Sequence, residues 1–386
     1  FLMDLSLTEE QIMIQDMAKK FAESELAPVA AQLDETMDQK LFLANLAQLT
    51  ELGFMGLNIK AEYGGVEAGS VAFSLAITEL ARACASTAVT TSVTNMVAEV
   101  IQAVGNEEQK QKHLPKLCSG EYRAGGFCLT EATAGSDPAG MKTQAVKDGD
   151  DYLISGSKLY ITSASFADVF VVWAVTDPEA KKGKGISCFI VEADTAGITV
   201  GKPEGKMGQK ASPTNEVHFD NCRVPASAMM GAENKGFGVA VGELAGGRIG
   251  IGSLALGVGL AALDYAKAHI VDRKQFGQPL ANFQGLQWKL AERYTEMEAA
   301  RLLLMQAAYT KEQGQPFGMA ASMAKLFATE NANKACYDAL QLMGGAGYIR
   351  EYPLERMARD VRVTSIYEGT SEIQKVIIAR ELLQNV

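Results

Sequence analysis

The sequence predicts an α+β protein with a helical N-terminal domain, a middle domain of β-strands and a C-terminal domain resembling a four-helix bundle. Three observations support this class. Apolar residues follow a helical period through the first third of the 386 residues, short β-branched or aromatic runs come next, and the helical period returns after Pro225. We place the domains at residues 1–121, 122–231 and 232–386. Several folding units fit this length, because single cores tend to stop growing at about 250–300 residues.

The first domain is expected to be mostly helical. Thr8 with Gln11, and Asn106 with Gln109, have the spacing of residues that cap a helix start. The expected helices cover residues 8–33, 39–53, 70–83, 91–104 and 107–118.

The middle domain is expected to form an antiparallel, barrel-like sheet, because no helical pattern separates its strands. The expected strands cover residues 152–155, 158–162, 169–175, 186–191 and 216–219. In the last domain, Ser371 and Gln374 suggest a capping box before the final helix. The expected helices there lie near 236–272, 282–313, 316–343 and 371–384.

Composition and charge exclude several classes of protein. The net charge is −10, from 36 basic and 46 acidic residues, and no basic stripe is present, so a nucleic-acid partner is not expected. The longest uncharged apolar run, Ile249 to Leu263, is shorter than the ~20 residues of a membrane span, so we expect a buried helix and no membrane partner. The N-terminus lacks the pattern of a secretory signal, and Phe1 and Leu2 look like a cloning remnant.

Cysteine and histidine give no sign of a metal or redox site. The six cysteines lie in mostly apolar surroundings without paired spacing, which indicates buried free thiols in a reducing compartment. None of the three histidines has metal-ligand spacing or lies near a serine elbow. Gly257, Gly259 and Ala262 match a dinucleotide-loop pattern, but no strand precedes them, so we attribute them to close helix packing.

Three other stretches carry more information in combination than alone. Residues 127–138 gather hydroxyls and small residues suited to a flat polar ligand, although a turn-rich connection would look the same. Tyr160 and Thr162 fall on one strand face if the strand alternates regularly. Glu368 precedes a glycine after an arginine-rich segment, and alone it would be an exposed carboxylate beside a helix cap.

Together, in this order and on this domain plan, these stretches resemble the acyl-CoA dehydrogenase family, and the resemblance extends over essentially the whole chain. The motifs that carry it are Tyr63-Gly-Gly, Leu129-Thr-Glu with Gly135-Ser-Asp, Lys158 to Thr162, Arg273-Lys-Gln-Phe-Gly, Gly344-Gly-Ala-Gly-Tyr and Tyr367-Glu-Gly-Thr. The chain looks most similar to the short-chain (butyryl) and isobutyryl-CoA enzymes. One departure is Glu131-Ala132-Thr133, where the family usually has Glu-Pro-Gly.

The resemblance implies a reaction. Glu368 would remove the α-proton of an acyl-CoA while the flavin of FAD accepts the β-hydride, leaving a trans double bond. The Glu368 amide and a flavin hydroxyl would hold the thioester oxygen. In the isovaleryl-CoA type of this family, the base stands at the position that corresponds to Gly247 here.

The resemblance also assigns binding residues. The positions expected to bind FAD are Phe127, Leu129, Thr130, Gly135, Ser136, Tyr160, Ile161, Thr162, Phe276, Thr370 and Glu372, with Arg273, Gln284, Gln341, Gly344 and Gly345 reaching the FAD of a neighbouring subunit. The positions expected to bind substrate are Ser136, Ala245, Gly246, Gly247, Arg248, Tyr367 and Gly369. Among these, Arg248 is expected to meet the anionic nucleotide end of CoA.

The implied partners are an acyl-CoA, an electron-transfer flavoprotein and three further copies in a dimer of dimers. The expected substrate is short-chain, with 2-methyl-branched acyl groups left open, in fatty acid β-oxidation or branched-chain amino acid catabolism. A bacterial cytoplasm is the expected location, with the mitochondrial matrix as the alternative. Two other functions stay open: an acyl-CoA oxidase that passes electrons to oxygen, and a non-catalytic helical scaffold.

Overall fold

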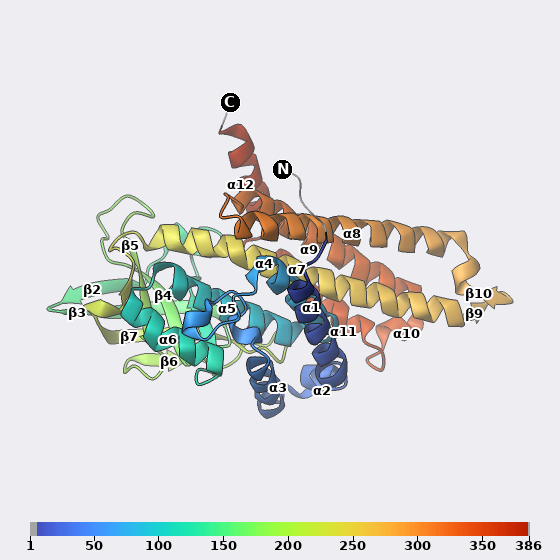
Figure 1. Cartoon of the computed structure of the whole chain (residues 1–386), viewed down its shortest axis with the longest axis horizontal. Helices are drawn as coiled ribbons and strands as arrows, with labels where there is room; N and C mark the ends of the chain where they lie inside the picture. Colours follow the sequence, from blue (N-terminus) through green and yellow to red (C-terminus); the bar gives the residue numbers. More distant parts are fainter. Residues whose placement is uncertain (1–5, 385–386) are drawn as a thin grey trace.

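A computed structural model describes residues 6–384 and shows the expected helix, sheet, helix order (Figure 1). Phe1 and Leu2 lie outside the described residues. The N-terminal helices are α1 (Glu9–Phe21), α2 (Ala30–Thr36), α3 (Gln39–Glu51), α4 (Gly69–Ala83), α5 (Ala85–Val104) and α6 (Glu107–Ser119), with a π-helix η1 (Ala22–Leu26) after α1.

Two details of this domain test the sequence expectations. The capping boxes at Thr8 and Asn106 are confirmed, since each side chain accepts the amide hydrogen three residues on. The single helix expected over 8–33 is wrong. The chain widens into the π-turn η1 and then turns before α2, so Leu26 and Leu33 are both buried although they lie on separate helical segments.

The middle domain is one mixed sheet, placed at one end of the molecule (Figure 1). Among the described residues it has eight strands in the order β6-β7-β3-β2-β4-β5-β8, with β1 also paired to β4. The strands are β1 (Gly125–Cys128), β2 (Gln144–Asp148), β3 (Asp151–Thr162), β4 (Val169–Val175), β5 (Ile186–Glu192), β6 (Ile198–Val200), β7 (Thr214–Pro225) and β8 (Met229–Met230).

The expectation of a purely antiparallel sheet is corrected in one respect. Most neighbours are antiparallel, but β1 runs parallel to β4, and Gln144 of β2 pairs in parallel with Val175. The parallel pair is possible because the β2–β3 excursion separates β1 from β4 in the chain. The two strands expected at 152–155 and 158–162 are one long strand, β3, with bulges against β7.

The C-terminal domain is organised around one long helix, α7 (Gly236–Asp272), which runs from the sheet to the opposite end of the molecule (Figure 1). It packs against α4, α5, α8 and α9. The other elements are the hairpin β9 (Lys274–Gln275) and β10 (Gln278–Pro279), then α8 (Gln284–Glu312), α9 (Gly318–Leu342), α10 (Gly345–Tyr348), α11 (Leu354–Arg362) and α12 (Ser371–Leu383).

The start of α12 differs from expectation. Its N-cap is Thr370, whose hydroxyl accepts the Ile373 amide at 3.3 Å, and not Ser371. Ser371 is the first helical residue and donates its hydroxyl to the Glu330 carboxylate. Both residues can cap a helix, so the sequence alone did not separate them.

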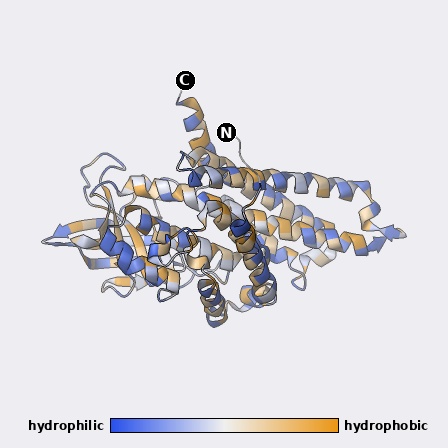
Figure 2. Cartoon of the chain, in the orientation of Figure 1, coloured by the Kyte–Doolittle hydropathy of each residue, from blue (hydrophilic) through white to orange (hydrophobic). Residues whose placement is uncertain are grey.

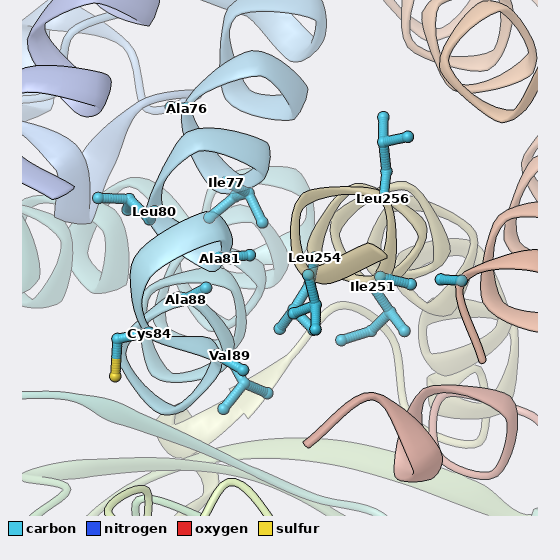
Figure 3. Close-up of a cluster of buried hydrophobic side chains, with 14 of the residues drawn as sticks. Ala76, Ile77, Leu80, Ala81, Cys84, Ala88, Val89, Ile251, Leu254 and Leu256 are labelled. Atoms are coloured by element: carbon cyan, nitrogen blue, oxygen red, sulfur yellow. The ribbon is translucent and has the colours of Figure 1, made fainter. Parts of the chain in front are cut away.

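The main core forms where α4 and α5 face α7, with Ile77, Val89 and Leu254 among the side chains that meet there (Figure 3). Glycine allows this close approach: a Cβ added at Gly257 would lie 2.2 Å from the Thr78 carbonyl oxygen, and one at Gly259 would lie 2.9 Å from Met297 Sδ. The interpretation of these glycines as helix-packing residues is supported.

Helix α7 is, within residues 6–384, the one helix long and apolar enough to cross a bilayer, but 78% of its most apolar window is buried inside the protein. Hydrophobic and hydrophilic residues alternate in bands along the outer helices, as expected where one face packs on a core (Figure 2).

The prediction of six buried free thiols is confirmed. No cluster of three or more metal-ligating His, Cys, Asp or Glu side chains occurs in the described chain.

Candidate active site

A cavity of about 660 Å³ lies between the sheet and the helices, and elements of all three domains line it. The sheet supplies the ends of β1 and β3 with the loop that follows β1. Opposite stand α5, α7 and the segment before α12. The predicted site residues that line the cavity are Phe127, Leu129, Thr130, Gly135, Ser136, Tyr160, Ile161, Thr162, Arg248, Tyr367, Glu368, Gly369 and Thr370.

The sheet wall of the cavity depends on a break in β3. The register against β7 shifts between Lys158 and Ile161, and Tyr160 takes a left-handed φ of 59° there. Tyr160, Ile161 and Thr162 therefore all line the cavity. The sequence argument for Tyr160 and Thr162 assumed that side chains alternate regularly between the two faces of the strand. That assumption fails at this end of β3.

A buried ion pair fixes the loop after β1. Lys158 Nζ contacts Glu131 Oε1 at 2.8 Å and donates to the Leu129 carbonyl at 3.1 Å, and both side chains are buried. Burial alone would raise the pKa of Glu131, but the Lys158 charge and two backbone amides lower it below its usual value. Burial lowers the pKa of Lys158, partly offset by Glu131. The loop is thus anchored through Glu131, although Ala132 and Thr133 replace the Pro-Gly that the family usually has after this glutamate.

Glu368 lies on the helical side of the cavity in an unusual backbone conformation. Its φ is 54°, in the left-handed region that residues with a Cβ rarely adopt. Its Oε2 atom is buried and has no hydrogen-bond partner among residues 6–384. A Cβ built at Gly247 would lie 2.8 Å from this oxygen. Position 247 therefore faces the same space as the carboxylate.

Two positively charged side chains, Lys325 and Arg248, act on the Glu368 carboxylate. Burial raises the pKa of Glu368 to about 7, and the charges of Lys325 and Arg248 limit that rise. Arg248 is 5% exposed and donates only a 3.4 Å hydrogen bond, to Ser322, within the described chain. Its Nε has no partner there. The guanidinium is therefore held deep in the protein beside the carboxylate, and its expected contact with the nucleotide end of CoA stays a prediction.

The other predicted positions do not line the main cavity, and they fall into two groups. Ala245 is buried. Gly246 and Gly247 line a second, very small cavity together with Glu99 and Glu243. Met96 lines both this cavity and the main one. The second group is exposed on the surface. It consists of Arg273, Phe276, Gln284, Gln341, Gly344, Gly345 and Glu372.

Several residues of the site were missed by sequence reasoning. The loop 204–209 lines the cavity, and Gln209 links Tyr367 to Asp360 through hydrogen bonds of 3.0 Å to each. Lys325 is buried on an alanine-rich helix, and its ammonium donates to the carbonyls of the two residues next to Glu368. A lysine among small residues on a buried helix face was the available signal, because such a charge requires a partner.

Family models match all three parts of the chain. They are the N-terminal, middle and C-terminal domains of acyl-CoA dehydrogenase, over residues 8–121, 126–222 and 234–383. The short-chain specific acyl-CoA dehydrogenase of Clostridium acetobutylicum is 43% identical, covering 99% of this chain and all of that protein. The mitochondrial short/branched chain specific acyl-CoA dehydrogenase of Rattus norvegicus is 42% identical, covering 98% of this chain and 86% of that one.

Solved structures agree over the full length. Butyryl-CoA dehydrogenase from Megasphaera elsdenii superimposes with a TM-score of 0.95 at 40% identity, covering 99% of this chain and 100% of that one. A chain from a structure described as the electron transferring flavoprotein of Acidaminococcus fermentans gives 0.96 at 41% identity, covering 99% and 100%.

These matches over all three domains show that the protein is a flavin-dependent oxidoreductase. The chain belongs to the acyl-CoA dehydrogenase family. It is an acyl-CoA dehydrogenase in type, and FAD is its cofactor. The residues present fit that cofactor: an added Cβ at Gly135 would meet no atom within 4 Å, so the loop beside the cavity has open space in front of it.

Proposed function

We propose that this protein catalyses α,β-dehydrogenation of a short-chain acyl-CoA, straight or 2-methyl-branched, to the trans-2-enoyl-CoA, with Glu368 as the base. The observation that carries the proposal is the Glu368 carboxylate, which lines the cavity with its Oε2 unpartnered among residues 6–384. Relatives named for short-chain and for short/branched chain substrates support the choice of acyl group.

Glu368 is suited to accept the α-proton. Burial raises its pKa to about 7, so a large fraction is ionised at neutral pH while the carboxylate is a stronger base than an exposed glutamate. A bound acyl chain would exclude further water and disfavour the charged form more. The base therefore gains strength when substrate is present.

The Glu368 amide is suited to hold the thioester oxygen. Its N–H makes no hydrogen bond with any described residue, unlike the amides of Ile366 and Tyr367, which bond to the Val363 carbonyl. A donor left free beside the base can stabilise the negative charge that develops on the carbonyl oxygen. We propose that this amide provides one of the two donors to that oxygen.

FAD supplies the acceptor for the β-hydride when bound. We propose that the wall formed by Phe127, Leu129, Thr130, Tyr160, Ile161 and Thr162 holds its ring, with Gly135 and Ser136 beside it. The amides at the start of α12, with Thr370 and Glu372, would meet its polar chain. The anchored Glu131 keeps this wall in place.

For the substrate, we propose that Tyr367, Gly369 and the segment 245–248 flank the acyl group, with Ser136 nearer the CoA. Arg248 then acts at the reacting end, where its charge favours the ionised form of Glu368.

The exposed set Arg273, Phe276, Gln284, Gln341, Gly344 and Gly345 supports assembly. Phe276 is 92% exposed, which is unusual for phenylalanine and expected where a second copy covers it. We propose a homotetramer in which these residues reach a neighbour's FAD, an electron-transfer flavoprotein as electron acceptor, and a location in a bacterial cytoplasm.

Anaerobic bleaching tests the proposal. The purified flavoprotein is mixed with butyryl-CoA, isobutyryl-CoA, 2-methylbutyryl-CoA and octanoyl-CoA, and flavin absorbance is followed by stopped flow. Rapid bleaching by a short-chain member is expected, with octanoyl-CoA slower. Absence of bleaching by every acyl-CoA would favour the scaffold, and rapid peroxide formation in air would favour the oxidase.

A further inference from the structure

We propose that Lys325 is a positioning residue that fixes Glu368 by holding the two carbonyl groups on either side of it. Lys325 Nζ donates to the Tyr367 carbonyl at 2.9 Å and to the Gly369 carbonyl at 2.6 Å. The inference rests on the proposed function only in taking Glu368 as the base.

Burying the charged Lys325 side chain costs desolvation free energy, so its hydrogen-bond partners are expected to be specific. Its exposed fraction is 0%, and it lies on a stretch of α9 lined by small residues such as Ser322, Ala324 and Ala328. A buried ammonium is unfavourable unless it is fully hydrogen-bonded. Both hydrogen bonds from Nζ within residues 6–384 go to the main chain beside Glu368, and none goes to a carboxylate.

The segment that Lys325 holds needs support. Glu368 has a left-handed φ of 54°, and Gly369 follows with a φ of 86°. Gln374 of α12 donates to the Glu368 carbonyl at 3.2 Å and to the Gly369 carbonyl at 2.9 Å. Three successive carbonyls are therefore held from two helices, which keeps the Glu368 side chain aimed into the cavity.

The charge of Lys325 also acts on the carboxylate. The ionisable groups that interact with Lys325 come from several elements: Glu368, Arg248 of α7, Glu330 of α9 and Glu372 of α12. Of these, Lys325 and Arg248 lower the pKa of Glu368 against the effect of burial. Removing Lys325 should therefore raise the pKa of the base and also loosen its backbone.

Lys325→Met and Lys325→Gln test the proposal, with Lys334→Met as the matched control. Lys334 lies on the same helix but is exposed, and within the described residues its ammonium makes one hydrogen bond, to Asn331 at 3.4 Å. The FAD-loaded variants are compared by anaerobic bleaching with butyryl-CoA from pH 5 to 9. We expect both Lys325 variants to react at least tenfold more slowly and with the midpoint of the pH profile at higher pH, and the control to match wild type.

Hydrogen exchange supplies a readout without catalysis. The amides of Ile366 and Tyr367 bond to the Val363 carbonyl, so loosening the segment should make them exchange roughly tenfold faster in either Lys325 variant, as expected for loss of a hydrogen bond to a charged group. If wild type bleaches but a folded Lys325 variant keeps its rate, pH midpoint and exchange rates, the proposal is wrong. If wild type never bleaches, the proposed function fails, and exchange alone decides the positioning role.

Discussion

The two ends of α7 differ in whether a single chain encloses the residues around them. Near its start, Arg248 and Glu368 line a cavity to which all three domains of one chain contribute, and a side chain at position 247 would point toward the Glu368 carboxylate. At its end, Arg273 and the hairpin that follows are exposed, with Phe276 uncovered. The proposed proton-removing site is thus assembled within one subunit, whereas the proposed cofactor contacts at the far end would require a second copy. Variants at the two ends should fail in different ways.

The largest effect is expected at the cavity end. Glu368→Gln should leave FAD bound and the fold intact, because the amide is nearly isosteric, but should slow flavin reduction by about 10²–10⁴-fold, the usual contribution of a general base. Stopped-flow bleaching measures this, with flavin content checked first. Bleaching at the wild-type rate would remove Glu368 from the mechanism.

A relocated base tests the geometry of that end. Glu368→Gly should lose nearly all activity, and adding Gly247→Glu should restore a measurable part, because position 247 faces the same space as the Glu368 carboxylate. The new side chain must pass Met96, whose Sδ lies 2.8 Å from a Cβ at 247, so chain-length preference should change. Steady-state oxidation of butyryl-CoA and isobutyryl-CoA compares the variants. A flavin-loaded double variant as inactive as the single one would contradict this placement.

The pH profile should report the same carboxylate. Glu368 acts as a base only when deprotonated, and burial raises its pKa to about 7. Because a bound acyl chain should raise this pKa further, the rate of flavin reduction should fall about tenfold per pH unit below a midpoint at or above pH 7 and level off above it. Stopped-flow traces from pH 5 to 9 measure the profile. A rate that stays constant down to pH 5 would show that Glu368 is not buried as described.

A smaller effect, of a different kind, is expected at the hairpin end. Arg273→Ala should weaken FAD retention and tetramer assembly together, by roughly tenfold or more, the usual loss for a hydrogen bond to a charged group. The flavin-to-protein absorbance ratio and gel filtration on dilution measure both. The exposed Lys274→Ala is the neighbouring control. A fully flavinated tetramer that stays intact would argue against the proposed role of Arg273.

The smallest effect concerns the middle of α7, which connects the two ends. Gly257→Ala should destabilise the protein by about 1–3 kcal/mol, because its Cβ would lie 2.2 Å from the Thr78 carbonyl oxygen. Gly242→Ala, also in α7, meets no atom within 4 Å and should be neutral or stabilising. Denaturant unfolding of the two variants measures the difference. Equal stability would mean that α4 and α7 are less tightly packed than described.

The sequence predicted the parts of the structure that depend on long periodic patterns. Helix α7 was expected over its observed span, and Glu368 was identified through its surrounding motif. Strand β1 was missed because Gly125 and Gly126 carry no side chains to alternate. The break in β3 at Tyr160 was missed because pairing with β7, distant in the chain, produces it. Lys325 was missed because its partners are main-chain atoms, so the sequence shows a lysine among small residues but not which groups it holds.

The burial of the cysteines has a practical consequence. Burial raises the pKa of all six thiols, Cys84, Cys118, Cys128, Cys188, Cys222 and Cys336, so few are ionised near neutral pH. We therefore expect the native protein to react slowly with maleimides. A cysteine introduced at an exposed position of β2, away from the hairpin that a second copy is proposed to cover, would be a single attachment point for a dye. Subunit exchange and docking of an electron acceptor can then be followed by fluorescence without removing any native thiol.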